Sequence, residues 1–195
     1  MTTKVYLIRH GETEWNKKRR YLGHTDIGLN SNGRLQAKRV RNILCGEPIH
    51  KVYASDLKRA VHFSRLIFKD IAAETMPQLR EINFGVFEGM TYKEIIKKYA
   101  KIYNKWLLSP FEAIIPDGDK LKDFRKKILK TYKKLVLQNS GKTIAIVTHA
   151  GPIRMILNDI LRPKNIWDIK IDNASITIVE HENKKTNMNL MNYTL

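Results

Sequence analysis

Two short apolar runs in this chain, residues 4–8 and 143–147, each lead within two residues into a histidine. Continuous runs of this length that are rich in β-branched residues are typical of strands covered on both faces, as in a parallel sheet. Ligands of such sheets bind just outside the carboxyl ends of the strands. The sequence therefore predicts that His10 and His149 lie together at one sheet edge, in a site that binds an anion. Two buried core histidines are the alternative, which the repeated pattern disfavours.

Helix and strand signals alternate through the first third of the chain. Ser31 is predicted to cap a helix that buries Leu35 and ends at Gly46, where a left-handed residue can close it. A strand at 51–54 follows, and then a second helix that runs through Ile71. This alternation predicts an α/β fold.

The middle of the chain is more helical. Thr91 and Glu94 have the spacing of a capping box, and the helix that they begin is expected to end at Pro110. A long basic helix over 121–136 comes next, and a further helix opens near Pro152, after the second histidine. These segments interrupt the strand-helix alternation.

Two strands are expected to close the chain, at 175–180 and 188–193, around a polar turn at 183–185. A chain of 195 residues has the length of one domain, and it contains no linker or internal repeat. The sequence therefore predicts a single domain over 1–195.

The charge balance is strongly basic, with 36 Lys and Arg against 19 Asp and Glu and a net charge of +17. Such a charge fits either nucleic-acid binding or a lysine-rich surface that attracts small anionic substrates. The basic pairs, such as Lys97-Lys98 and Lys133-Lys134, are scattered and are not interleaved with aromatic residues. We therefore expect no nucleic-acid partner.

The chain shows no sign of export or of membrane association. Its N-terminal apolar run is too short for a signal peptide, and no stretch approaches the roughly 18 apolar residues of a membrane span. A cytoplasmic protein without a membrane partner is expected. Cys45, the only cysteine, is predicted to be a small core residue because it lies in an apolar helical pattern.

The residues around the two histidines suit phosphate chemistry. Arg9 directly precedes His10, and Arg59 lies in the first turn of the helix after strand 51–54, which places it at the same edge. Arginine matches the geometry of phosphate oxygens, and neutral imidazole is a competent nucleophile. With His149, the two arginines could stabilise the charge of a phosphoryl group in transfer. The same positive charges should lower the pKa of His10 and keep it unprotonated.

A phosphate monoester also needs an acid that protonates its leaving oxygen. Glu81 is predicted to be this acid, because it lies in an apolar loop at 79–85 where partial burial favours the protonated form. Glu12 and Glu88 are alternatives that spacing alone does not exclude.

Four motifs follow one another along the chain: Arg9-His10-Gly11-Glu12-Thr13, Ser55-Asp56-Leu57-Lys58-Arg59-Ala60, Glu81 within its loop, and Thr148-His149-Ala150-Gly151. Together they resemble the histidine phosphatase superfamily, which also contains cofactor-dependent phosphoglycerate mutases. The resemblance spans almost the whole chain. It implies a three-layer sandwich with a mostly parallel central sheet, helices on both faces and a helical insertion over the active site.

The resemblance also implies roles for individual residues. His10 would take the phosphoryl group as phosphohistidine, and Glu81 would act first as acid and then as base for water. The phosphate would be held, without a metal or other cofactor, by Arg9, Arg59 and His149. Further substrate-binding residues implied by the motifs are Asn16, Gly23 and Gly151.

Within the superfamily, the segment 81–91 is similar to the small bacterial phosphatases, especially the α-ribazole phosphatases. At the positions where a mutase needs cations, this segment has the apolar residues Ile82, Phe84, Val86 and Phe87. Apolar side chains suit the flat face of a heterocycle. The expected activity is hydrolysis of a small-molecule phosphate ester, specifically α-ribazole 5′-phosphate, by a monomer or homodimer. The alternatives are a phosphoglycerate mutase and a non-catalytic phosphate- or RNA-binding protein.

Overall fold

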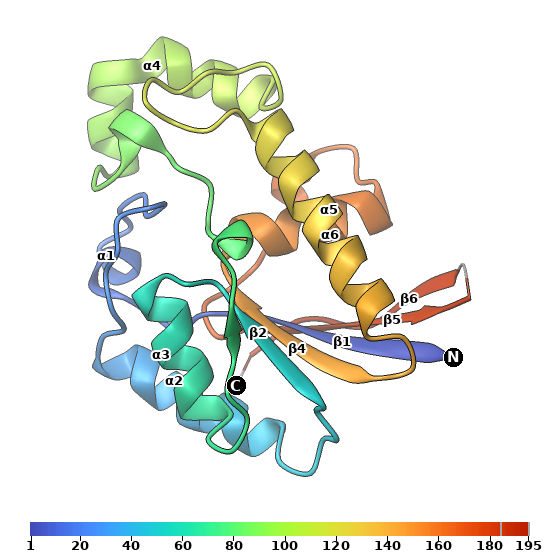
Figure 1. Ribbon diagram of the computed structural model, residues 1–195. Coiled ribbons are helices and arrows are strands. Elements are labelled where there is room, and N and C mark those ends of the chain that lie inside the picture. The colour runs from blue at the N-terminus through green and yellow to red at the C-terminus, as the bar shows by residue number, and fades with distance from the viewer. Residues whose placement is uncertain (184, 195) are drawn as a thin grey trace.

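The computed structural model describes residues 1–183 and 185–194, and within them the chain forms a six-stranded sheet in the order β3-β2-β4-β1-β5-β6 (Figure 1). The strands are β1 (Thr2–Arg9), β2 (Lys51–Ala54), β3 (Glu74–Thr75), β4 (Thr143–Thr148), β5 (Ile176–Glu182) and β6 (Lys185–Tyr193). The strands from β3 to β1 pair in parallel, and β5 and β6 extend the sheet with antiparallel pairing. The predicted α/β class with a mostly parallel sheet is confirmed.

Helices cover both faces of this sheet. They are α1 (Glu14–Lys17), α2 (Ser31–Ile43), α3 (Lys58–Ile67), α4 (Tyr92–Leu108), α5 (Leu121–Gln138) and α6 (Ala150–Leu161), with short 3₁₀ turns at Pro77–Leu79, Gly85–Phe87 and Ile166–Asp168. None of the helices in the described part of the chain combines the length and the apolar character needed to cross a membrane.

The two strands that carry the histidines are apolar on both sides because they separate two cores. Val5 and Leu7 of β1 pack with α5 and α6, whereas Tyr6 and Ile8 pack with α2 and α3. The neighbouring strand β4 alternates in the same way and is buried along almost its whole length. This alternation confirms the predicted layer of helices on each face.

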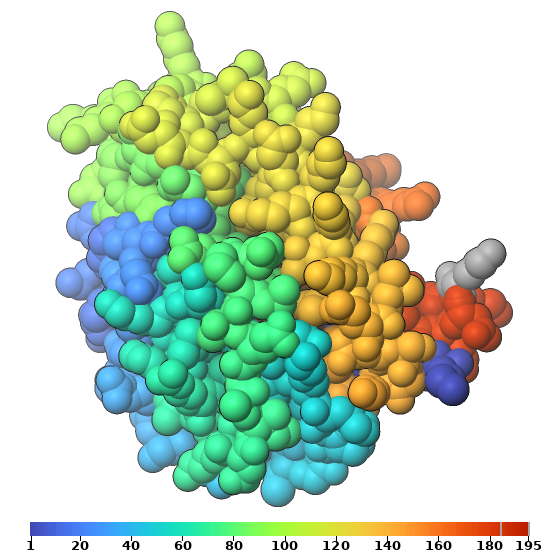
Figure 2. Space-filling view, viewed as in Figure 1, coloured from blue at the N-terminus to red at the C-terminus, as the bar shows by residue number. Residues whose placement is uncertain are grey.

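The insertion α4 lies apart from the sheet, at the top of the view in Figure 1. It begins with the expected capping box, in which Thr91 and Glu94 exchange hydrogen bonds. Its buried side chains include Tyr103 and Trp106, and Tyr103 stacks against Phe87 of the segment that follows Glu81. In Figure 2, α4 and the start of α5 form the upper surface, from which several long side chains project.

The helix α2 begins one residue earlier than expected. Asn30, not Ser31, is the N-cap, because its Oδ1 accepts a hydrogen bond from Gly33 N at 2.8 Å and its Nδ2 donates to Glu12 Oε1. The face that α2 buries consists of Gly33, Ala37 and Val40. The prediction that Leu35 is buried was therefore wrong, since this side chain is 51% exposed.

Other element boundaries also differ from those expected. The helix α2 ends at Ile43, which leaves Cys45 exposed and makes its assignment to the core wrong. The helix α3 ends at Ile67 instead of Ile71, and the two-residue strand β3 was not predicted. The predicted turn at 183–185 includes Lys184, which lies outside the described residues.

The position of the α2 cap leads to a stability prediction. Asn30→Ala should lower the free energy of unfolding by about 1 kcal/mol, because the orphan N–H groups of the first turn lose their acceptor. A loss of this size should reduce Tm by about 2–4 °C, measured by circular dichroism. The neighbouring Ser31→Ala is the control and should leave Tm unchanged. A lower Tm for Ser31→Ala and an unchanged Tm for Asn30→Ala would contradict the prediction and place the cap at Ser31.

Candidate active site

The parallel pairing of β1 with β4 brings the two predicted histidines together. Arg9 is in register with Thr148, and the backbone N–H of His10 donates to Thr148 O at 2.9 Å. The imidazole rings of His10 and His149 lie 5.0 Å apart between centroids, and both residues are buried. The two strands thus end side by side, as the sequence predicted.

Arg59 connects the two histidines from the start of α3. Its Nε–H donates to His10 Nε2 and to His149 Nδ1, each at 3.2 Å. Its terminal nitrogens donate to two backbone carbonyls, those of Thr25 at 3.0 Å and Gly23 at 2.6 Å. The side chain is fully buried, and burial lowers the pKa of Arg59 to about 10. Each of these four acceptors is uncharged.

The hydrogen bonds also define which imidazole nitrogens carry protons. His10 Nδ1 lies 2.7 Å from Gly11 O, and because a carbonyl oxygen can only accept, Nδ1 must be the protonated nitrogen. His10 Nε2 is therefore unprotonated, and its lone pair accepts the N–H of Arg59. His149 Nδ1 likewise accepts from Arg59, so that its Nε2–H donates to Ser55 Oγ at 2.8 Å. Ser55 thus orients His149.

Both imidazoles have low basicity. The pKa of His10 lies well below its ordinary value because burial disfavours the charged ring, and the guanidinium groups of Arg59 and Arg9 act in the same direction. Burial is also the largest cause of the lowered pKa of His149. The sequence predicted the effect of the arginines on His10, and burial adds a larger one.

Arg9 retains donors that the protein does not use. Its Nη1 donates to Ile171 O at 2.7 Å, which fixes the direction of the side chain. Its Nε is buried and has no hydrogen-bond partner among residues 1–183 and 185–194. Burial lowers the pKa of Arg9 to about 10. A buried donor of this kind at the end of a strand is suited to bind an anion.

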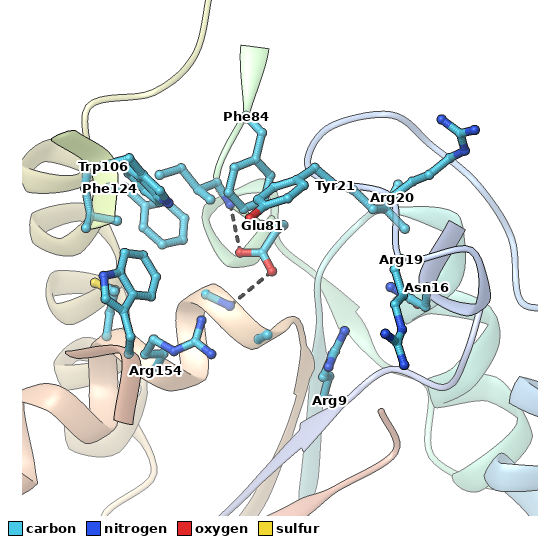
Figure 3. A pocket seen from close by; sticks show the side chains of 17 residues that line it. Arg9, Asn16, Arg19, Arg20, Tyr21, Glu81, Phe84, Trp106, Phe124 and Arg154 are labelled. Atoms are coloured by element: carbon cyan, nitrogen blue, oxygen red, sulfur yellow. Dashed lines mark hydrogen bonds between the residues drawn. The ribbon is translucent and has the colours of Figure 1, made fainter. Parts of the chain in front are cut away.

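Glu81 lies in the wall of a pocket next to this cluster. Its two carboxyl oxygens accept hydrogen bonds from the N–H groups of Ile82 and Gly151, each at 3.0 Å, as Figure 3 shows. A Cβ atom at position 151 would lie 1.9 Å from Glu81 Oε1, so a larger residue there would displace the Glu81 carboxyl group. Gly151 therefore positions Glu81 from the first turn of α6.

The two competing glutamates lie elsewhere. Glu88 accepts hydrogen bonds from the backbone N–H groups of His24 and Thr25 and from the Thr25 hydroxyl, so it holds the loop that carries Gly23. Glu12 accepts from Asn30 at the start of α2. Neither carboxylate lines the pocket of Glu81. The geometry thus separates three candidates that spacing could not.

The three residues predicted to bind substrate lie in different surroundings. Asn16 lines the pocket, and its Oδ1 accepts from Thr13 and Asn173, which leaves its NH₂ group to donate. Gly23 contacts Arg59 through its carbonyl oxygen, and a Cβ atom there would lie 2.3 Å from Glu88 Oε1. Gly151 holds Glu81. Of the three, Asn16 and Gly151 line the pocket.

The pocket has a cationic side and an aromatic side (Figure 3). The residues that line the cationic side include Arg9, Arg19, Arg20 and Arg154, and the rings of the other side belong to Tyr21, Phe84, Trp106, Phe124 and Trp167. Sequence reasoning missed Arg19 and Arg154. The available signals were an arginine close behind Asn16 and another one turn beyond Gly151.

The described residues contain no group of three or more His, Cys, Asp or Glu side chains that could hold a metal ion. The charges that face the pocket are instead those of guanidinium groups and of Glu81. This donor set suits the binding of phosphate oxygens.

The chain is similar to known phosphatases along almost its whole length. Phosphoserine phosphatase 1 of Hydrogenobacter thermophilus is 27% identical over 98% of this chain and 92% of its own length. The adenosylcobalamin/alpha-ribazole phosphatase of Salmonella typhimurium is 25% identical, over 91% of this chain and 90% of its own. The crystal structure of phosphoserine phosphatase from Entamoeba histolytica in complex with 3-phosphoglyceric acid covers 98% of both chains with a TM-score of 0.89 and 30% identity. The family model of the histidine phosphatase superfamily, branch 1, matches residues 5–194, so the chain belongs to this superfamily and is a phosphatase.

Proposed function

We propose that the protein hydrolyses the phosphate monoester of a small metabolite through a phosphohistidine at His10, without a metal. The observation that carries this proposal is the state of His10 Nε2. Its partner nitrogen Nδ1 donates to Gly11 O, so Nε2 is unprotonated and has a lone pair, which accepts from Arg59 in a buried site that also contains Arg9. A nucleophile that is neutral and fixed next to cations can attack a phosphorus atom whose oxygens those cations hold.

In the first step, His10 Nε2 forms a bond to phosphorus and the bond between phosphorus and the alcohol oxygen breaks. Glu81, as the carboxylic acid, gives its proton to that oxygen. In the second step, the Glu81 carboxylate takes a proton from water, and the water oxygen attacks phosphorus as the P–N bond breaks. Inorganic phosphate leaves, and Glu81 is protonated again. Arg9 and Arg59 hold the phosphoryl oxygens in both steps, and His149 joins them once the negative charge of the bound phosphate favours protonation of its Nδ1.

The identity of the alcohol is a finer proposal, with two candidates. The α-ribazole 5′-phosphate expected from the sequence is supported by the rings of the pocket and by the Salmonella relative. Of the four apolar residues on which that expectation rested, Ile82 and Phe84 line the pocket, whereas Val86 and Phe87 pack in the core. Phosphoserine is supported by the Hydrogenobacter and Entamoeba relatives.

Hydrolysis, and not mutase activity, is proposed as the main reaction. The test is a panel of phosphorylated metabolites that includes both candidates and 3-phosphoglycerate with a bisphosphoglycerate primer. Release of inorganic phosphate should exceed the primer-dependent interconversion of phosphoglycerates. A dominant mutase flux would overturn the proposal of hydrolysis. Absence of turnover on the whole panel would favour a binding protein.

The first prediction concerns the nucleophile. His10→Ala should lose nearly all turnover, to less than about a hundredth of the wild-type rate, because positioning and electrostatics alone do not replace the covalent step. In the wild type, rapid quenching with labelled substrate should trap a phosphoenzyme that survives alkali and is lost in acid. The exposed His62→Ala is the matched control and should keep full activity.

The second prediction concerns the acid. Glu81→Gln should slow the hydrolysis of alkyl phosphates by about 10²- to 10⁴-fold, because their alkoxide leaving groups need a proton. Its effect on p-nitrophenyl phosphate should be much smaller, since nitrophenolate leaves without one. Equal losses on the two substrates would contradict the role of Glu81 as general acid.

The third prediction concerns pH. Because the pKa of His10 is lowered, Nε2 is still unprotonated when the pH falls through 6.5, the pKa of an ordinary imidazole. The value of kcat/KM should therefore not fall near this pH. The decline should begin only at a more acidic pH. Profiles with an alkyl and an aryl phosphate separate the ionisation of the enzyme from that of the substrate. A fall in kcat/KM near pH 6.5 that both profiles share would mean that the pKa of His10 is not lowered, and would contradict the prediction.

A further inference from the structure

The pocket contains more positive charge than the phosphoryl group requires. Arg9 and Arg59 converge on the end of β1 beside His10, where the phosphate is proposed to bind. Arg154 and Arg19 line the same pocket, and neither forms an ion pair within the described part of the chain. Among the described residues, the only carboxylate in the pocket wall is that of Glu81, which accepts from two backbone N–H groups.

Arg154 is fixed in place before any ligand binds. Its Nε donates to Ile169 O at 3.0 Å, and its guanidinium lies 5.6 Å from the centroid of the Trp167 ring. Trp167 is held in turn by Trp106, at 5.2 Å between ring centroids, and by a hydrogen bond to Leu107 O. The Nε bond leaves the two terminal nitrogens of Arg154 to donate into the pocket, toward which Figure 3 shows the side chain pointing.

The surroundings of Arg154 make an unpaired charge costly. The side chain is partly buried against aromatic rings. Burial lowers the pKa of Arg154, and the charge of Glu81 acts in the opposite direction and raises it. A partly buried cation without a counter-ion is stabilised by an anion more than an exposed cation is.

Arg19 adds a second cation at the exposed rim. Its backbone has a φ of 52°, a left-handed conformation that residues with a side chain rarely adopt. In Figure 3 its guanidinium points toward Arg9 and Asn16. The adjacent Arg20 points away from Arg9. It donates to Gly89 O and Glu94, so it stabilises the contact with the start of α4.

We propose that Arg154 binds a carboxylate on the alcohol part of the substrate, which makes the substrate a phosphorylated hydroxy acid or amino acid. This inference rests on the proposed function. Arg154 lies one turn beyond Gly151, which positions Glu81, and Glu81 serves the leaving oxygen. The alcohol therefore lies on the side of Arg154. A neutral nucleoside would leave this guanidinium without a charged partner. A carboxylate, in contrast, can accept hydrogen bonds from both terminal nitrogens of Arg154.

The test compares substrates that differ only in the carboxylate. One pair is phosphoserine and phosphoethanolamine, and the other is 3-phosphoglycerate and glycerol 3-phosphate. The wild type should prefer the carboxylate member of each pair by about 10- to 100-fold in kcat/KM, the range expected of a hydrogen-bonded ion pair. α-Ribazole 5′-phosphate, which has no carboxylate, should be a poorer substrate than phosphoserine.

The variants assign the preference to residues. Arg154→Gln should reduce the ratio within each pair toward one, by lowering kcat/KM for the carboxylate member more than for the other member. Arg154→Lys should keep part of the preference, because it retains the charge without the fork. Arg19→Gln should have a smaller effect, since an exposed charge is screened by water and salt. The exposed Arg65→Gln is the control for loss of a positive charge and should leave the ratio unchanged.

The outcomes separate this inference from the proposed function. If Arg154→Gln lowers both members of a pair equally while its thermal melt is unchanged, Arg154 serves the phosphate or Glu81 and the carboxylate inference is overturned. Phosphate release by the wild type without a preference within the pairs also overturns it, and the proposed function stands. No release from any ester would overturn the proposed function itself.

Discussion

The parallel pairing of β1 with β4 is the constraint on which the site depends. It places Arg9 opposite Thr148 and brings His10 and His149 to the same edge of the sheet. The register of this pairing is defined by the packing of both faces, because alternate residues of each strand enter different cores. A shift by one residue would send each set of apolar side chains to the wrong face. The relative position of the two imidazoles is therefore defined by the hydrophobic core.

Arg59 shows that this arrangement is not optimised for the stability of the free protein. Its guanidinium is fully buried, and its acceptors are two imidazole nitrogens and two backbone carbonyls, none of which carries a negative charge. Burial of a cation that has no carboxylate in hydrogen-bond contact is unfavourable. The charges of Glu81, Asp26 and Glu88 offset part of this cost, and the nearby charge of Arg9 adds repulsion. A bound dianion would relieve both effects. The same feature that weakens the free protein thus strengthens binding of a phosphoryl group.

Much of the fold and of the histidine cluster could be predicted because the signals are local. A continuous apolar run shows that a strand is covered on both faces, and the residue that follows its end lies at the edge, as His10 and His149 do. Side-chain exposure within α2 was not predictable in the same way, since the face buried in the folded chain runs through Gly33, Ala37 and Val40, and Leu35 lies outside it. Arg154 was missed because its direction depends on Ile169 and Trp167, contacts made only in the folded chain.

The concentration of cations around Arg59 has a consequence for turnover. Donors aimed at phosphoryl oxygens act on any species that carries them, so the inorganic phosphate formed in the reaction is attracted by the same groups as the ester. These contacts therefore do not weaken when the alcohol departs. We therefore expect escape of the product from the end of β1 to compete with chemistry as the slowest step, and accumulated phosphate to act as an inhibitor.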